Sequence, residues 1–206
     1  MLESRVPPCP PAPPMTIGVM GSAGGELSAH ASAMAYELGR AIARAGCTLV
    51  NGACPGLPYE AARGAKAEGG MVVGISPGLS VQEHVEKYRS PTDHLDVIVY
   101  TGSGLMGREV TNIRSSDIVV IVGGRSGTLG EFAIAFDEGK LIGVLEGTGG
   151  ITAALPGIVE ICRKDSGGYV IFDSDPQCLI AHLIDYYDRV HRKHPSCFAS
   201  TERAEA

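Results

Sequence analysis

The stretch Val119-Val-Ile-Val-Gly-Gly-Arg-Ser-Gly-Thr-Leu-Gly-Glu131 joins an apolar run to a glycine-rich turn and then to helix-forming residues. Four apolar residues bounded by Gly123 and Gly124 are typical of a strand that is covered on both faces. Thr128, followed three residues later by Glu131, has the spacing of a capping box that opens a helix. The stretch therefore predicts a buried strand, a loop whose backbone N–H groups can hold an anion, and a helix whose positive end faces that anion.

Outside this stretch, short runs rich in Val and Ile alternate with longer segments of helical periodicity. The alternation predicts an α/β fold: a single Rossmann-like, doubly wound domain with a central parallel sheet of about seven strands flanked by helices. We expect the strands at residues 16–20, 48–50, 71–75, 97–100, 118–122, 141–145 and 169–172. We expect the helices at residues 28–45, 58–68, 81–88, 105–115, 128–138, 151–163 and 176–191.

The two ends of the chain differ in composition from the rest. Residues 1–14 hold six prolines, which exclude a helix and predict a disordered, proline-rich lead. Met15 could be the natural start. We therefore expect a nucleotide-binding domain over residues 15–192, followed by a flexible tail over residues 193–206.

Charge and cysteine usage narrow the function classes. A net charge of -6 and a pI near 5.5 argue against non-specific binding to nucleic acid or to an anionic membrane surface. No apolar run reaches 18 residues, so no transmembrane helix is expected. The six cysteines form no CxxC pair and the histidines no ligand cluster, which predicts a cytoplasmic protein without a metal site.

Three glycine-rich loops follow predicted strands, at residues 21–25, 52–56 and 123–127. The carboxyl ends of parallel strands meet at one edge of the sheet, so all three loops should border one crevice. The pattern G-x-x-x-x-G-K-[ST] is absent, which disfavours an ATP-hydrolysing protein. A small phosphorylated ligand is the expected partner.

Several short motifs, taken together and in this order, resemble the LOG (Lonely Guy) superfamily: Gly18-Val-Met-Gly-Ser22, Gly56-Leu57, Arg108, Ser116-Asp117 and Gly124-x-x-Gly-Thr-x-x-Glu131. The resemblance covers roughly residues 15–190. It implies a Rossmann-like homodimer that hydrolyses the N-glycosidic bond of cytokinin riboside 5′-monophosphates or AMP, without a cofactor, to the base and ribose 5-phosphate. The candidate residues for the dimer interface are Ala133, Phe136 and residues 105–113.

The chain also departs from the pattern of the LOG enzymes, Pro-Gly-Gly-x-Gly-Thr-x-x-Glu. Gly123 stands in place of the proline, Arg125 in place of the second glycine, and Glu109 in place of the lysine in the Arg-Lys pair. In these departures the chain is more similar to a short branch that includes molybdenum-cofactor carrier proteins. The alternative function is therefore non-catalytic carriage of molybdenum cofactor or a related phosphorylated ligand. Lysine decarboxylation, an older label for such sequences, is not expected, because no lysine is placed for a pyridoxal Schiff base.

The hydrolysis of a ribosyl bond builds positive charge on the sugar, which a carboxylate beside the ribose can stabilise. Glu131 is the candidate carboxylate for this role or for activating the attacking water, and the resemblance implies that Arg108 is also catalytic. The candidate residues for binding the phosphate or nucleotide are Gly21, Ser22, Gly124, Arg125, Ser126, Gly127 and Thr128.

The two catalytic candidates have structural alternatives. Glu131 could merely complete a capping box with Thr128. Arg108 could be a solvated charge on a helix face, paired with Glu109 or Asn112.

Five further residues remain open in the same way. Ser22 could donate to the ligand or serve as a turn residue. Arg125 could contact an acidic ligand or point to solvent. Glu60 and Asn112 could face the crevice or the surface, and Asp117 is expected to orient the start of a strand without chemistry.

Overall fold

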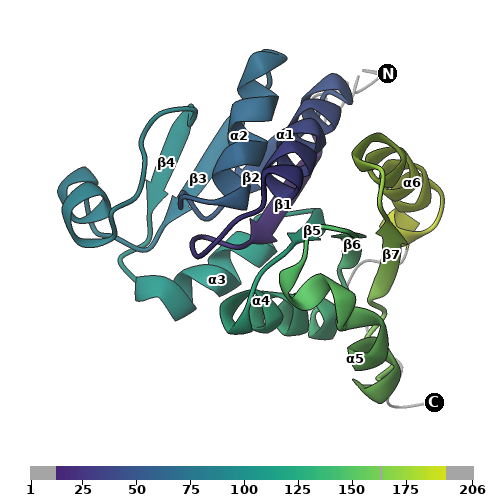
Figure 1. The fold of residues 1–206 in the computed structure, drawn as a ribbon. Coiled ribbons are helices and arrows are strands. Elements are labelled where there is room, and N and C mark those ends of the chain that lie inside the picture. Colours follow the sequence, from purple (N-terminus) through teal and green to yellow (C-terminus); the bar gives the residue numbers. More distant parts are fainter. Residues whose placement is uncertain (1–12, 163, 194–206) are drawn as a thin grey trace, which may run out of the picture.

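In a computed structural model that describes residues 13–162 and 164–193, seven strands form one parallel sheet with helices on both faces (Figure 1). The strands are β1 (Thr16–Gly21), β2 (Thr48–Asn51), β3 (Val72–Ser76), β4 (Val97–Tyr100), β5 (Ile118–Val122), β6 (Leu141–Leu145) and β7 (Tyr169–Asp173). The predicted fold class and all seven predicted strands are confirmed. The predicted lead and tail lie almost entirely outside the described residues.

The strand order is β4-β3-β2-β1-β5-β6-β7, so the chain winds outward from β1 to one edge and then returns to add β5 on the other side of β1. Gly21 pairs with Val122, which places the carboxyl ends of β1 and β5 level with each other. In a doubly wound sheet, this reversal of direction is where the loops diverge and leave a crevice.

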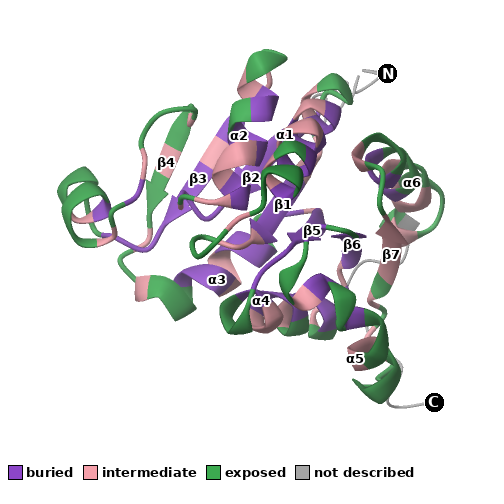
Figure 2. Cartoon of the chain, viewed as in Figure 1, coloured by how far each residue is buried: buried purple, intermediate pink, exposed green. Residues whose placement is uncertain are grey.

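Two apolar layers hold the helices to the sheet. The helices α1 (Ala29–Arg44), α2 (Leu57–Ala67) and α6 (Pro176–Arg189) pack on one face, and α3 (Gly104–Arg114), α4 (Ser126–Asp137) and α5 (Leu155–Cys162) contribute to the other (Figure 1). Every residue of β5 is buried, as expected for a central parallel strand (Figure 2). No helix among the described residues is long and apolar enough to cross a membrane.

Two helices begin directly after residues whose side chains cap the first turn. The Ser28 hydroxyl accepts a hydrogen bond from the backbone N–H of Ala31 at 3.0 Å, which opens α1. The Asp175 carboxylate accepts from the N–H groups of Gln177 and Cys178, both at 2.8 Å, which opens α6. These contacts satisfy N–H groups that the first turn of a helix leaves without partners.

Three predicted helices differ from the structure. The predicted capping box is wrong, because α4 begins at Ser126 and has no side-chain cap; positive φ angles at Gly123 and Gly124 turn the chain earlier than expected. Residues 83–87 form a π-helix, in which Tyr88 N–H reaches the Glu83 carbonyl. The helix predicted over residues 151–163 is a 3₁₀ turn followed by α5, because Pro156 lacks an N–H and suits only the start of a helix.

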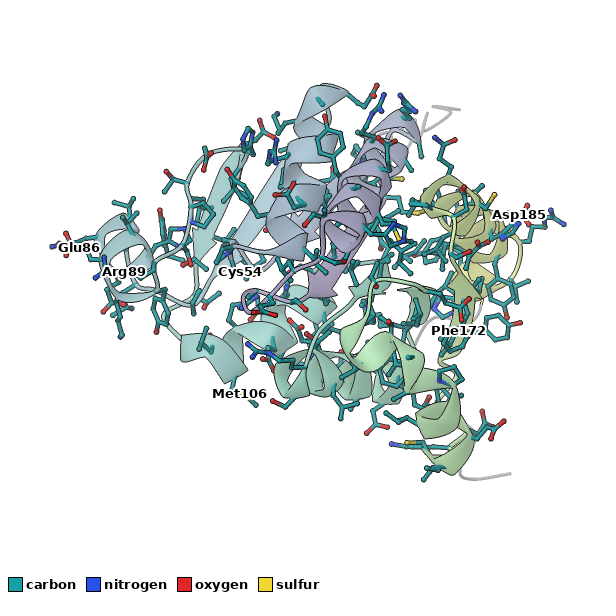
Figure 3. The ribbon with its side chains drawn as sticks, viewed as in Figure 1. Cys54, Glu86, Arg89, Met106, Phe172 and Asp185 are labelled. Carbon is teal, nitrogen blue, oxygen red and sulfur yellow. The ribbon has the colours of Figure 1, made fainter. Side chains whose placement is uncertain are left out.

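The candidate interface residues have different environments. Phe136 is 8% exposed and stacks on Phe132 in the core, so its prediction as an interface residue is wrong. On α3, by contrast, Leu105 is 56% exposed and Met106 is 71% exposed, and Met106 projects away from the sheet (Figure 3). An apolar surface on α3 is therefore open in the single chain.

Candidate functional site

A cavity of about 440 Å³ opens beyond the carboxyl ends of β1, β2 and β5. The first glycine-rich loop contributes residues 21–23 to the lining, and the second loop contributes Gly52 and Cys54. The third loop contributes residues 125–127, and Thr128 follows it in α4. Cys54 lies near the middle of the molecule, just beyond β2 (Figure 3). The prediction that three separate loops border one crevice is confirmed.

The third loop is held in a single conformation from both sides. Gly123 and Gly124 have φ angles of 60° and 97°, which favour glycine. The Gly124 N–H donates to the Ser22 hydroxyl at 2.7 Å, and the Gly123 N–H donates to the Thr148 hydroxyl at 2.9 Å. A side chain at Gly124 would come within 2.4 Å of Thr128 Cβ, so the turn and the helix that follows it fit only with glycine.

The amino end of α4 opens into this cavity without a cap. Arg125 precedes the helix, and its side chain makes no capping hydrogen bond. The N–H groups of Ser126, Gly127 and Thr128 therefore have no partner within the helix, and all three residues line the cavity. Together with the helix dipole, these N–H groups have the arrangement that favours an anion at the start of a helix.

Arg108 is buried at the carboxyl end of β2, with 7% of its surface exposed. Its guanidinium lies against Gly52, where an added methyl group would come within 1.7 Å of Nη1. The Nε atom is buried and has no hydrogen-bond partner. The alternative of a solvated charge on the helix face is therefore wrong, and Arg108 is held at the cavity with a donor still available.

Glu131 projects from the second turn of α4 into the same cavity and is 7% exposed. Its pKa is raised to about 7, mainly by burial; the nearby charge of Arg108 opposes the rise, and the charge of Glu109 adds to it. Because α4 begins at Ser126, Glu131 has no capping position, so the alternative of a capping box is excluded. A carboxyl group with this pKa can accept or release a proton near neutral pH.

Glu109 is a third buried charged residue at the cavity, and the sequence reasoning did not assign it a role. It is 7% exposed, its Oε2 has no partner, and its carboxylate lies 3.6–3.7 Å from where side chains at Gly127 and Gly130 would begin. Burial raises its pKa, and Arg108 opposes the rise. The feature of the sequence that could have indicated this position is the pair Gly127 and Gly130. The two glycines stand three residues apart and leave one face of α4 without side chains, where the Glu109 side chain of α3 fits.

The remaining predicted residues divide between the cavity and the scaffold. Arg125 is exposed at the cavity mouth, with its guanidinium 3.8 Å from the Cβ position of Gly25, so it spans two loops. Glu60 pairs with Arg63 at 2.8 Å and does not line the cavity. Asn112 is fully buried and does not line the cavity. Its side-chain amide donates to the sulfur of Met20, which does line the cavity.

Asp117 has the structural role that was expected of it. Its carboxylate accepts from the backbone N–H of Thr16 at 2.8 Å and from the Thr16 hydroxyl at 3.0 Å. The contacts join the start of β5 to the start of β1, at the end of the sheet away from the cavity.

Cys54 also lines the cavity and was assigned no role from the sequence. The pKa of its thiol is raised to about 11, mainly by burial; Arg108 lowers the pKa and Glu131 raises it, both by smaller amounts, so the thiol is protonated at neutral pH. Within residues 13–162 and 164–193, no group of three or more His, Cys, Asp or Glu side chains is arranged to hold a metal ion.

The chain is similar to known proteins in sequence and in fold. A protein of Archaeoglobus fulgidus without an assigned function is 38% identical over 132 residues, which is 64% of this chain and 80% of the relative. The molybdenum cofactor carrier protein of Chlamydomonas reinhardtii is similar in structure, with 30% identity, a TM-score of 0.69, and coverage of 86% of this chain and 100% of the carrier. The molybdenum cofactor binding protein of Rippkaea orientalis has 28% identity, a TM-score of 0.69, and coverage of 85% and 98%.

The residues that carry the site lie within the part of the chain that a family model recognises. The model of the SLOG cluster4 family matches residues 14–180, from before β1 into α6. The match therefore includes all three glycine-rich loops, Arg108 and Glu131. The chain belongs to the SLOG cluster4 family.

Proposed function

We propose that the cavity binds a nucleoside 5′-monophosphate or a closely related phosphorylated ligand. The phosphate lies on the N–H groups of residues 126–128 and on the Thr128 hydroxyl, at the positive end of α4. The Ser22 hydroxyl accepts from Gly124 and retains its own proton to donate to the ligand. Arg125, at the mouth, has the charge and reach to close over a bound anion.

We propose further that the protein hydrolyses the N-glycosidic bond of this ligand, releasing the base and ribose 5-phosphate. The observation that carries the proposal is the convergence of Arg108 and Glu131, both buried, on the cavity that contains the phosphate-binding loop. Arg108 positions the ribose or phosphate through its planar guanidinium. Ionised Glu131 stabilises the positive charge that develops on the ribose and accepts a proton from the attacking water.

The test is to incubate the purified protein with AMP and with an N6-isopentenyladenosine 5′-monophosphate, followed by chromatography for the free base. We expect base release by the wild type and a loss of at least about 100-fold in the Glu131→Gln variant. Equal release from the wild type and from Glu131→Gln would contradict the assignment, and no release above background would contradict hydrolysis.

A second candidate function is carriage of molybdenum cofactor, favoured by the 28–30% identity to two proteins that are named for binding it. Glu109 and Arg125, which replace residues of the LOG enzymes, both line the cavity. In this case the phosphate of the cofactor occupies the end of α4, and Glu131→Gln leaves binding largely intact. Native mass spectrometry of protein mixed with the cofactor, and protection of the cofactor against oxidation, test this function. An empty protein that gives no protection would contradict it.

We also propose that the protein acts as a homodimer in the cytoplasm and does not take nucleic acid as its ligand. The exposed apolar side chains of Leu105 and Met106 support a dimer through α3. The net charge of -6 supports a small ligand over nucleic acid, and the unpatterned cysteines support a reducing compartment.

A further inference from the structure

The hydrolysis proposed above needs a proton at the departing base as well as a base for water. A purine that leaves as an anion is a poor leaving group, and a positioned acid that protonates it typically contributes 10²–10⁴-fold to the rate. Glu131 cannot act as the acid in the same step in which it accepts the proton of the attacking water. The cavity must therefore supply a second group that can donate a proton to the base.

Among the described residues that line the cavity, Glu109 and Glu131 are the only two with carboxyl side chains, and burial raises the pKa of both. Arg108 and Arg125 do not release a proton in proteins. The Cys54 thiol has a pKa of about 11 and gives up its proton too reluctantly. The serine and threonine hydroxyls are weaker acids still. Elimination leaves Glu109.

The position of Glu109 explains why it would hold the proton when ligand is bound. Its carboxylate lies against Gly127, whose N–H belongs to the proposed phosphate site, so a bound phosphate anion favours the neutral carboxylic acid at this residue. The Oε2 atom is buried without a donor, which also favours the neutral form.

The other charges around Glu109 also distinguish its role as the acid from the role of Glu131 as the base. Arg108, on the same helix, opposes protonation of both glutamates, and Glu131 on α4 repels the charge of Glu109. The repulsion between two carboxyl groups disfavours the state in which both are ionised and favours a state in which one of them holds a proton. The positive charge that develops on the ribose favours the ionised form of the carboxylate beside it, which is Glu131 in the proposed function.

We propose that Glu109 is the general acid that protonates the departing base; the inference rests on the proposed hydrolysis. The Glu109 proton moves to a ring nitrogen of the base, and the C1′–N bond breaks with its electron pair going to the base. Water forms the new C1′–O bond and gives a proton to Glu131. Transfer of that proton back to Glu109 through solvent restores the starting state, and the net reaction consumes one water.

The experiment compares AMP with two monophosphates whose bases are already cationic and leave without protonation: 7-methylguanosine 5′-monophosphate and nicotinamide mononucleotide. Each rate is expressed relative to the wild type on the same substrate. We expect Glu109→Gln to lower kcat on AMP by about 100-fold or more and to lower it less than about 5-fold on the cationic substrates. We expect Glu131→Gln to be slow on all three.

Glu60→Gln serves as the matched control, because Glu60 pairs with Arg63 outside the cavity. Its rates should equal those of the wild type, and circular dichroism should show that all variants are folded. Rescue of Glu131→Gln in place of Glu109→Gln, equal losses of Glu109→Gln on all substrates, or full activity of Glu109→Gln on AMP would each overturn the assignment. A wild type that releases no base from AMP or from either cationic substrate would overturn the proposed function itself.

Discussion

Gly52 determines where the Arg108 guanidinium lies, because a single methyl group at this position would overlap Nη1. We expect Gly52→Ala to displace the end of the arginine side chain while the fold persists, since that end is flexible. Release of base from AMP, or binding of the phosphorylated ligand, should fall at least about 10-fold through the lost contact. Gly157→Ala is the control, because nothing lies within 4 Å of the added methyl group. Unchanged activity of Gly52→Ala would mean that Arg108 has no role at the cavity.

Glu131 makes the stability of the protein depend on pH. Its pKa rises from 4.5 to about 7 on folding, so the folded chain binds more protons than the unfolded chain between these values. The contribution to stability is fully present below pH 4.5 and is lost as pH rises toward 7. We expect Glu131→Gln to be more stable than the wild type at pH 8, by up to about 3 kcal/mol, and similar to it at pH 4.5.

Urea unfolding at the two pH values measures this difference. Glu60→Gln should leave the pH dependence as it is, because Glu60 is half-buried and pairs with Arg63 outside the cavity. If Glu131→Gln and the wild type lose stability equally between pH 4.5 and 8, burial does not raise the pKa of Glu131.

At the scale of an element, the amino end of α4 lies at the cavity, and its first N–H groups have no side-chain cap. A carboxylate at Ser126 should interact favourably with the helix dipole, by about 0.3–1 kcal/mol, and should repel a phosphate from the same position. We expect Ser126→Asp to keep or raise the free energy of unfolding and to weaken ribose 5-phosphate binding by at least about 10-fold.

Isothermal titration with ribose 5-phosphate, together with chemical unfolding, checks this expectation. Ser126→Ala separates the effect of the added charge from the loss of the hydroxyl and should bind within a few-fold of the wild type. Equal binding by Ser126→Asp and Ser126→Ala would place the anion elsewhere.

At the scale of the whole molecule, the exposed apolar side chains on α3 lie next to the cavity, since Leu105 also lines it. We expect the wild type to be a dimer by light scattering after size exclusion, and Met106→Glu to be a monomer, because a charge would be buried without a partner in the interface. Ile161→Glu, at a residue on α5 that is 82% exposed, should leave the dimer intact. A monomeric wild type would contradict the dimer.

The overall architecture was predictable because strand and helix follow from local periodicity. The five apolar residues of β5 act over a few positions, and the structure places them in the predicted strand. The start of α4 was not predictable in this way. Thr128 and Glu131 have the spacing of a capping box, but the positive φ angles of Gly123 and Gly124, supported by contacts to Ser22 and Thr148, move the helix start to Ser126.

The sequence by itself determined the seven-stranded α/β fold, the glycine-rich loops and the candidacy of Arg108 and Glu131, because these depend on residue type and short spacing. Only the tertiary structure decided which side chains share the cavity. Glu109 acquires its position from the bare face of α4 at Gly127 and Gly130, and Arg108 acquires its position from Gly52, more than 50 residues away in the chain. The raised pKa of Glu131 has the same origin, because burial and neighbouring charges from α3 exist only after the helices pack against each other.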